Sequence, residues 1–371
     1  MSTTARADLA PLTSMRGIAA LVVVIYHFSG GFLPNLDLAA TTGLVSKGYL
    51  WVDFFFVLSG FILSHAYADR FSDTVTWASF RAFIDARFAR IYPLHFLILM
   101  GFLLLELTKL ALIHLDWGQR VDRPFGDSTD AYGFVLNALL LQTSGLQSYN
   151  TWNGPAWSIG AEFGAYLLFP LLTILVVRHG GSLRLALAGA ALAGLWVISA
   201  EGTDLDRTAD FGLLRCAFEF TLGILTYRAF LRLPRHLLSG SDPLMLLGAG
   251  ILLAMHFEWP DVLIPPAYAL LILFLAANQG LPARLLSRAP LVRLGVISYS
   301  IYMSHYLVLS VIQVMARALT GAGVGRNLDA GLSVLVLGLV TLVVVLGSNW
   351  LYEAVEEPAR ARVKGWLARI G

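Results

Sequence analysis

Long apolar stretches separated by short polar joints dominate the sequence. The run LSVLVLGLVTLVVVLGSNW at 332–350 is apolar on every face of a helix, and about 20 such residues span a bilayer. A membrane β-barrel would instead alternate apolar and polar residues over segments of about 10 residues. We therefore predict an all-α polytopic membrane protein with about ten transmembrane helices, at 15–33, 51–67, 93–113, 157–177, 184–200, 211–228, 244–257, 262–277, 293–316 and 331–353.

One apolar segment is too short for this scheme. If YGFVLNALLLQ at 132–142 crossed the membrane, every later loop would change sides, so we interpret it as a re-entrant or interfacial piece. With ten crossings, most lysines and arginines of the joints fall on the side of the two termini. Because short loops rich in Lys and Arg stay in the cytoplasm, both termini are predicted to be cytoplasmic.

The composition supports a single transmembrane domain over residues 1–371, with the lipid bilayer as its surroundings. Hydrophobic residues make up 57% of the chain, charged residues 13%, and mean hydropathy is +0.71. The net charge of +2 is spread over the joints, so no nucleic-acid partner is expected. The single cysteine, Cys216, excludes an internal disulfide and a multi-thiolate metal site. The sequence does not indicate the oligomeric state.

Two ionisable residues lie on the first predicted helix, and such residues are costly inside a membrane and therefore candidates for function. In RGIAALVVVIYHF, Arg16 and His27 are eleven residues apart, so they share one helix face about 16 Å apart along the axis. Arg16 then marks the inner surface, and His27 lies in the outer half. An arginine at the membrane boundary and a histidine bonded to a neighbouring helix fit the pattern equally well.

The second predicted helix places an aspartate at a depth similar to that of His27. It opens with WVDFFFVLSGFILSH, and Asp53 lies at its outer end. An aspartate at that depth can orient a histidine and fix its tautomer. Capping of the helix N-terminus is an equally economical role for Asp53. Only proximity to His27 separates the two interpretations.

A pair of arginines precedes the third predicted span. In FRAFIDARFARIYPLHFL, Arg87 and Arg90 are three residues apart and therefore neighbours on one helix face. Two adjacent guanidinium groups suit a phosphate or pyrophosphate group. Retention of positive charge at a helix entrance is the simpler interpretation of the same residues.

A glutamate lies inside the fourth predicted span. In WSIGAEFGAYLLFP, Gly160 and Gly164 form a pair of small residues that permits close helix contact. Glu162 points away from that contact, and Tyr166 lies on its face one turn further on. We therefore expect Glu162 and Tyr166 to face a polar cavity.

The ninth predicted span carries a polar stripe. In LGVISYSIYMSHYLVL, Ser298, Tyr302 and His305 are spaced at i, i+4 and i+7, and a polar stripe on an apolar helix normally lines an interior. His27 and His305 lack a repeated ligand spacing such as H-x-x-x-H, so no metal or haem site is expected.

Six segments together resemble the acyltransferase family 3 of integral membrane proteins. They follow one another from residue 12 to about 360: RGIAALVVVIYHF, WVDFFFVLSGFILS, RFARIYPL, WSIGAEFGAYLLFP, LGVISYSIYMSHY and YEAVEEPAR. The family's arginine-x10-histidine motif falls on Arg16 and His27, and its R-x-x-R motif falls on Arg87 and Arg90. The EEP at 356–358 departs from the family's usual ERP, and we attach no functional consequence to it.

The resemblance implies ten core helices and transfer of an acyl group, commonly acetyl from acetyl-coenzyme A, onto a hydroxyl of a carbohydrate or glycan. The donor would come from the cytoplasm and the acceptor from the outer side of a bacterial cytoplasmic membrane. Acyl-CoA is then a co-substrate, and no permanently bound cofactor is expected. By resemblance, His27 is the catalytic base and Arg16, Arg87 and Arg90 help to hold the donor.

In the mechanism that these residues suggest, Asp53 or Glu162 holds the imidazolium of His27 while the acceptor hydroxyl attacks the thioester. An acyl-histidine intermediate is equally compatible with the residues. The competing class is a proton-coupled transporter of a polar solute, in which the buried histidines and carboxylates form a proton relay. The acceptor and the length of the acyl group are left open.

Overall fold

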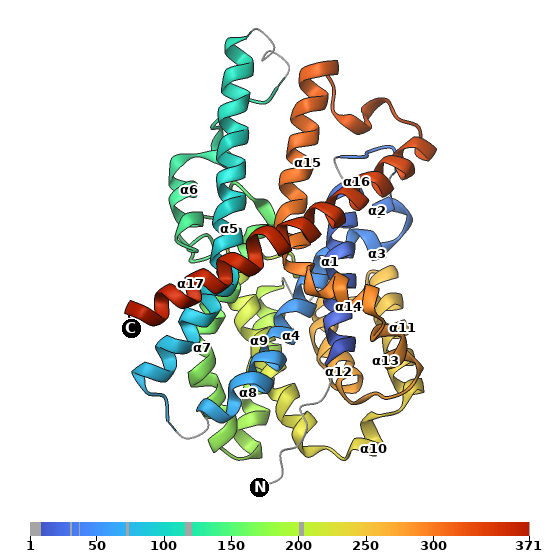
Figure 1. Ribbon diagram of the computed structural model, residues 1–371. Coiled ribbons are helices and arrows are strands. Elements are labelled where there is room, and N and C mark those ends of the chain that lie inside the picture. Colours follow the sequence, from blue (N-terminus) through green and yellow to red (C-terminus); the bar gives the residue numbers. More distant parts are fainter. Residues whose placement is uncertain are drawn as a thin grey trace.

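The computed structural model describes residues 9–29, 32–36, 38–71, 74–115, 121–199 and 204–370, and within these ranges the chain forms helices and no strand (Figure 1). Each predicted span corresponds to a helix: α1 (Ala10–Ser29), α4 (Trp51–Tyr67), α5 (Trp77–His114), α7 (Trp157–Arg178), α8 (Gly181–Ile198), α9 (Gly212–Arg232), α11 (Ser241–His256), α12 (Ile264–Ala277), α15 (Ser298–Thr320) and α16 (Ala330–Leu351).

Shorter helices lie between these long ones, and α17 follows the last of them. The α-helices among them are α2 (Leu38–Thr41), α3 (Gly43–Ser46), α6 (Ala131–Ala138), α10 (Arg235–Leu238), α13 (Leu281–Leu286), α14 (Ala289–Val296) and α17 (Glu357–Ile370). The 3₁₀ turns are η1 (Gly48–Leu50), η2 (Ala68–Phe71), η4 (Asp127–Thr129), η5 (Gly154–Ala156), η6 (Asp261–Leu263) and η7 (Val324–Asn327), and a π-helical turn, η8 (Tyr352–Glu356), joins α16 to α17.

The apolar helices confirm an all-α membrane protein. In the part of the chain that the structure describes, seven helical stretches are long and apolar enough to cross a membrane: Ala10–Ser29, Gly48–Phe71, Trp77–His114, Gly154–Arg178, Gly181–Ile198, Ser298–Thr320 and Ala330–Arg369. Ser241–His256 and Asp261–Ala277 are shorter apolar helices, and α9 carries the charged residues Arg215 and Glu219. The ten crossings and the cytoplasmic termini stay predictions. Residues 30, 31 and 200 of the predicted spans lie outside the described residues.

The short apolar segment at 132–142 forms only the eight-residue helix α6, which ends at Ala138. Eight residues extend about 12 Å as an α-helix, far less than the thickness of a bilayer. The helix is fastened to α5, because Tyr92 donates a hydrogen bond to the carbonyl of Ala138 at 3.0 Å and His95 Nε2 lies 2.8 Å from the carbonyl of Asn137. This geometry agrees with a segment that does not cross the membrane as a helix.

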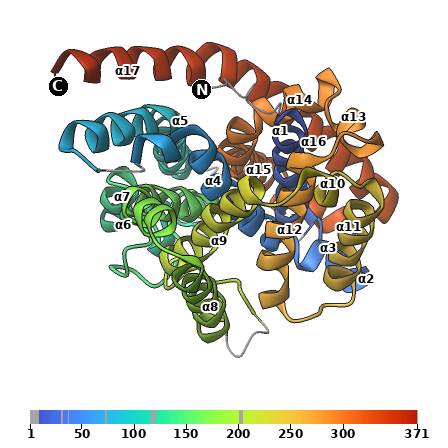
Figure 2. The ribbon, with the colours of Figure 1, turned by 90° about the horizontal axis from the view of Figure 1, so that it is seen from below.

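Helix α1 contacts α4, α12, α14, α15 and α16, which lie around it in Figure 2. Its backbone touches that of α14, because a Cβ atom added at Gly295 would lie 1.8 Å from the carbonyl oxygen of Thr13. Only a residue without a side chain permits such an approach. Since α15 follows α14 directly, this contact sets the two polar faces of α1 and α15 against each other.

A second pair of glycines joins α4 to α9. A Cβ atom at Gly60 would lie 2.1 Å from the carbonyl oxygen of Phe220, and one at Gly223 would lie 2.0 Å from that of Val57. The two helices therefore pack backbone to backbone, which small residues make favourable in a membrane. The close packing brings the N-terminal end of α4, with Asp53, against Arg215 of α9.

Helix α5 has two parts that run in different directions in Figure 1. Pro93 lies inside the helix, and a proline removes one backbone hydrogen bond and clashes with the preceding turn, so it bends a helix. Arg87 and Arg90 lie just before this proline. The bend turns the end of the first part, with both arginines, toward the interior of the bundle, where they line a cavity.

Candidate active site

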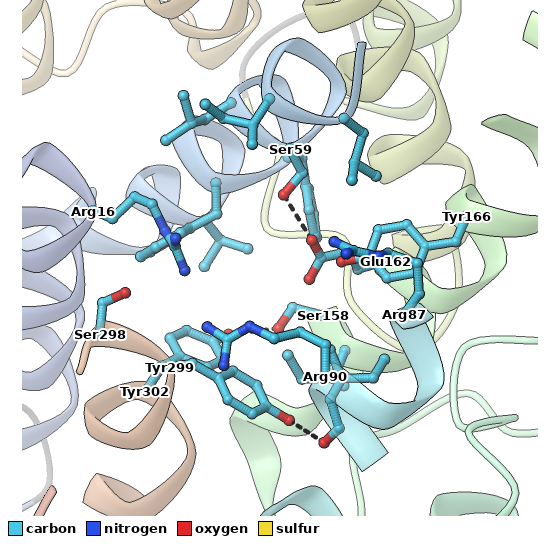
Figure 3. Close-up of a pocket in the computed structure, with 18 residues that line it drawn as sticks. Arg16, Ser59, Arg87, Arg90, Ser158, Glu162, Tyr166, Ser298, Tyr299 and Tyr302 are labelled. Atoms are coloured by element: carbon cyan, nitrogen blue, oxygen red, sulfur yellow. Dashed lines mark hydrogen bonds between the residues drawn. The ribbon is translucent and has the colours of Figure 1, made fainter. Parts of the chain in front are cut away.

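The arginines of α1 and α5 meet in a cavity of about 130 Å³ (Figure 3). It is called the inner cavity here, after the predicted orientation of the chain. Helices α1, α4, α5, α7 and α15 all contribute side chains to its wall. Its polar lining residues are Arg16, Ser59, Arg87, Arg90, Ser158, Glu162, Tyr166, Ser298, Tyr299 and Tyr302. Seven of the residues predicted from the sequence to form the site are therefore brought together by helices far apart in the chain.

The three arginines of the inner cavity differ in how they are bound. Arg90 forms an ion pair with Glu356 of η8, and the other carboxylate oxygen of Glu356 accepts a hydrogen bond from Ser300 at 2.6 Å. Arg87 donates from Nη2 to the hydroxyl of Tyr67 at 3.1 Å, and its buried Nε has no partner among the described residues. The structure records no hydrogen bond or ion pair from Arg16 to another described residue. Arg16 and Arg87 thus keep donors available for an anion, whereas the charge of Arg90 is balanced.

Glu162 faces the same cavity, as its spacing from Gly160 and Gly164 predicts. Its carboxylate accepts a hydrogen bond from Ser59 of α4 at 2.6 Å (Figure 3). A Cβ at Gly164 would meet the side chain of Leu213 of α9, and one at Gly160 would meet Gln142, so the glycine face is closely packed while the glutamate faces the cavity. The wall of the inner cavity therefore carries three arginines and one carboxylate.

A larger cavity of about 550 Å³ contains His27 in its wall and is called the outer cavity, after the same predicted orientation. Aromatic and charged side chains surround it: Tyr26, Tyr49, Phe102, Glu106, Lys109, Asp122, Trp152, Trp157, Asp206, Tyr306 and Arg317. Lys109 is paired with Glu106, and Arg317 with Asp122. Asp206 lies in the joint between α8 and α9, and its burial raises the pKa of its carboxyl group above the usual range. Aromatic faces next to polar groups suit a ligand with both apolar faces and hydroxyl groups.

The two cavities share two residues of their walls, Val52 of α4 and Tyr302 of α15. The hydroxyl of Tyr302 accepts a hydrogen bond from Ser158 at 2.8 Å and donates one to the carbonyl of Pro155 at 3.0 Å. These bonds hold the ring of Tyr302 in place between the arginines on one side and His27 on the other. This shared wall therefore separates the three arginines of one cavity from His27 in the other.

His27 is held from two sides. Its Nδ1 lies 2.9 Å from the carbonyl oxygen of Val23, one turn earlier in α1, and 3.2 Å from Nε2 of His305 on α15. The structure records no hydrogen bond from a described residue to Nε2 of His27. Because the ring is half-buried and lines the outer cavity, Nε2 is the nitrogen left to act on a ligand.

The family of the chain follows from comparison with known proteins. A family model described as an acyltransferase domain matches residues 11–353, which is most of the chain. The chain belongs to this acyltransferase family. The acyltransferase is also similar to "Acyltransferase MdmB" of Streptomyces mycarofaciens, with 29% identity over 388 residues that cover 94% of this chain and 91% of that protein.

A second relative covers a smaller part. It is "Protein 2 in picA locus" of Rhizobium radiobacter, 42% identical over 88 residues that cover 24% of the acyltransferase and 40% of that protein. No solved structure matches the acyltransferase significantly.

The role expected of Asp53 is corrected by the structure. Both carboxylate oxygens of Asp53 accept hydrogen bonds from Arg215, at 2.7 Å from Nε and 2.6 Å from Nη2, and all of these groups are fully buried. Glu219 lies 3.7 Å from the same guanidinium group. A buried arginine requires a counter-charge, and the glycine contact of α4 with α9 brings Asp53 to it. Asp53 therefore binds Arg215 and does not orient His27.

Glu162 and His305 also differ from expectation. Glu162 lines the inner cavity and His27 the outer one, and the structure records no hydrogen bond between these two described residues. His305 is not among the residues that line these two cavities, and its fully buried ring packs against His27 and Tyr302. His305 was expected in a cavity wall and is not in the wall of either of these cavities, whereas Tyr166, Ser298 and Tyr302 line the inner cavity of the acyltransferase.

Several residues of the acyltransferase were not identified from the sequence. Ser59 binds Glu162, Ser158 binds Tyr302, and Glu356 binds Arg90. The sequence did contain an indication for Glu356, because this carboxylate follows directly on the last apolar span, in a segment that is otherwise rich in basic residues. Ser59 and Ser158 gave no signal, because single serines are common in membrane helices and only the packing shows what they face.

Proposed function

We propose that the protein is a membrane O-acyltransferase of the bacterial cytoplasmic membrane. It takes an acyl group, most commonly acetyl, from cytoplasmic acyl-CoA and transfers it to a hydroxyl of a carbohydrate or glycan at the outer side. One observation carries the proposal: a cavity with three arginines and a cavity with a half-buried histidine meet at Val52 and Tyr302. Family membership and the bacterial origin of the relatives support it.

The donor is assigned to the inner cavity by charge. Guanidinium groups bind phosphate oxygens through short, charge-assisted hydrogen bonds, and Arg16 and Arg87 have donors to offer. The narrow pantetheine arm then extends past Tyr302, so that the thioester meets His27. The acceptor is assigned to the outer cavity, which has roughly four times the volume of the inner one and aromatic rings for the faces of a sugar.

The chemistry needs one base and one acid in succession. Nε2 of His27 takes the proton of the acceptor hydroxyl as its oxygen attacks the thioester carbonyl carbon. The carbon–sulfur bond breaks, and the proton on Nε2 passes to the thiolate sulfur of the leaving coenzyme A. Transfer through an acyl-histidine uses the same nitrogen as a nucleophile. Family membership favours this chemistry over the proton relay of a transporter.

Replacement of Arg87 by alanine is expected to weaken binding of acetyl-CoA by about 10- to 100-fold, the range for loss of one charge-assisted hydrogen bond. Arg87 is a sharper choice than Arg90, because removal of Arg90 also leaves Glu356 buried without its cation. The measurement is titration of the purified protein with acetyl-CoA. Arg81→Ala is the matched control, since Arg81 lies on the same helix outside the inner cavity and pairs with Asp85.

Two results of this titration would count against the proposal. Absence of any acetyl-CoA binding by the unmodified protein would remove the donor and favour a transporter. Equal affinities for the Arg87→Ala protein and the unmodified protein would mean that the donor lies elsewhere.

Replacement of Val52 by phenylalanine is expected to separate the two cavities. Val52 is 5% exposed and lies in the wall that both cavities share, so a larger ring there displaces the thioester from His27. A misplacement of about 1 Å lowers a rate by about 100-fold, so acyl transfer should fall by at least that factor. Retained acetyl-CoA binding shows that the variant is folded, and Val52→Ala should keep transfer. Normal transfer by Val52→Phe would place the route elsewhere.

A further inference from the structure

The proposed chemistry uses His27 and leaves its neighbour His305 without a role. The ring of His305 is fully buried, and its centroid lies 5.0 Å from that of His27. Phe28, Tyr302 and Tyr306 surround it, with centroids at 6.4, 5.9 and 6.4 Å. Burying a second imidazole away from water is costly unless its ring nitrogens form hydrogen bonds. The partners of these nitrogens therefore indicate what His305 does.

Both histidines have a backbone carbonyl one turn earlier in their own helices as a partner for Nδ1. Nδ1 of His27 lies 2.9 Å from the carbonyl of Val23, and Nδ1 of His305 lies 3.2 Å from that of Ile301. A carbonyl oxygen only accepts, so each Nδ1 must carry the hydrogen. Nε2 of His305 is then a bare acceptor, 3.2 Å from Nδ1–H of His27.

The opposite arrangement of hydrogens fails this test. If Nε2 of His305 donated to Nδ1 of His27, then Nδ1 of His27 would be bare and its contact with Val23 would join two acceptors. One assignment therefore satisfies all three contacts at once: Nδ1–H of His27 is shared between the carbonyl of Val23 and Nε2 of His305. In that tautomer the lone pair of His27 is on Nε2, the nitrogen without a described partner.

We propose that His305 is the positioning residue that holds His27 in its Nδ1–H tautomer and shares the positive charge that His27 acquires during transfer. This inference rests on the proposed role of His27 as the base. A carboxylate commonly has this position behind a catalytic histidine. Here neither nearby carboxylate is available to His27, because Asp53 is bound by Arg215 and Glu162 accepts from Ser59 in the other cavity.

The proton balance of the step is complete with these groups. When Nε2 of His27 takes the proton of the acceptor hydroxyl, the ring becomes an imidazolium, and its Nδ1–H bond to Nε2 of His305 strengthens. His305 keeps its own hydrogen on the carbonyl of Ile301. When Nε2 of His27 gives its proton to the thiolate of coenzyme A, both rings are neutral again. A neutral acceptor has the advantage that the resting pair buries no charge.

The test compares two replacements of His305. His305→Phe keeps a flat ring but offers no acceptor, whereas His305→Gln offers an amide oxygen to His27 and an amide hydrogen to Ile301. One readout is the ¹⁵N spectrum of histidine-labelled protein in membranes, with His27→Gln to assign the signal. The other is thiol release from acetyl-CoA with water as the acceptor, analysed for kcat and KM.

In the unmodified protein we expect Nε2 of His27 to give the signal of a ring nitrogen without hydrogen. His305→Phe should shift His27 toward the Nε2–H tautomer and lower kcat by about 10- to 100-fold, with KM for acetyl-CoA unchanged. His305→Gln should restore most of the lost rate. If His305 had only a structural role, its replacement would not change the tautomer of His27. The rates of the glutamine and phenylalanine variants would then not differ according to whether the new side chain offers a hydrogen-bond acceptor.

The outcomes separate the inference from the proposed function. A hydrogen on Nε2 of His27 in the unmodified protein would overturn the inference, whatever the activity. If His27→Ala is inactive and His305→Phe is as active as the unmodified protein, the inference about His305 is wrong, whereas the assignment of His27 as the base is supported. If His27→Ala releases thiol at the normal rate, the proposed function fails together with the inference.

Discussion

Replacement of His27 by alanine is expected to abolish acyl transfer while the protein still inserts in the membrane and binds acetyl-CoA. Loss of a general base lowers a rate by about 10²- to 10⁴-fold, and loss of a nucleophile removes the relay altogether. Donor affinity should stay within error, because the arginines of the inner cavity are in a different wall from His27. The measurement is transfer of labelled acetyl groups in membranes, with acetyl-CoA binding measured in parallel.

A second histidine provides a matched control for this variant. His256 is exposed at the end of α11, where its Nδ1 is 2.8 Å from the hydroxyl of Thr42, and it lines neither cavity. His256→Ala should therefore transfer acetyl groups normally. Normal transfer by His27→Ala would show that this imidazole is not the base, and a joint loss of binding and transfer would indicate misfolding.

Replacement of Arg215 by methionine is expected to be the most destabilising of the changes considered. Arg215, Asp53 and Glu219 are all fully buried, and Arg215 is the cation that Asp53 and Glu219 share. Removal of one partner from a buried ion pair costs about 3–5 kcal/mol, because the remaining charge is left without compensation. Little folded protein should be recovered, and its thermal unfolding in detergent should occur at a clearly lower temperature than that of the unmodified protein.

Variants of Asp53 test whether its ion pair with Arg215 is structural or catalytic. Asp53→Asn combined with Arg215→Met removes both charges of the closest pair and should recover part of the stability lost in Arg215→Met alone. If Asp53→Asn alone has normal stability and normal donor binding but no transfer, then Asp53 takes part in the chemistry. Its predicted position at a membrane depth similar to that of His27 suggested such a role. The geometry predicts the contrary, a loss of stability in which activity falls with the amount of folded protein.

The hydrophobic pattern of the sequence was sufficient to predict the positions of the long helices. Each of the ten predicted spans coincides with a helix to within a few residues, except that Pro93 lies inside α5, which begins at Trp77, well before the predicted span. The reason is that an apolar run in a bilayer must satisfy its own backbone hydrogen bonds, and a helix does so locally. A proline inside such a helix bends it without ending it, because neighbouring helices stabilise the broken turn.

Part of the candidate site could also be predicted from the sequence. The eleven-residue spacing predicted Arg16 and His27 on one face at different depths, and they line the inner and the outer cavity respectively. Glu162 was predicted to face a cavity from its spacing relative to two glycines, and it does. In each case the inference used only the repeat of one helix, which the local sequence determines.

The pairing of side chains from different helices was decided by the tertiary structure alone. Asp53 was expected to serve His27 and instead binds Arg215, because Gly60 and Gly223 let α4 and α9 meet backbone to backbone. His305 was expected in a cavity wall and instead stands behind His27. The sequence by itself determined which residues share a face of a helix and how far apart they lie along it, since both follow from helix geometry. Which faces meet depends on packing between distant segments, and no local pattern contains that information.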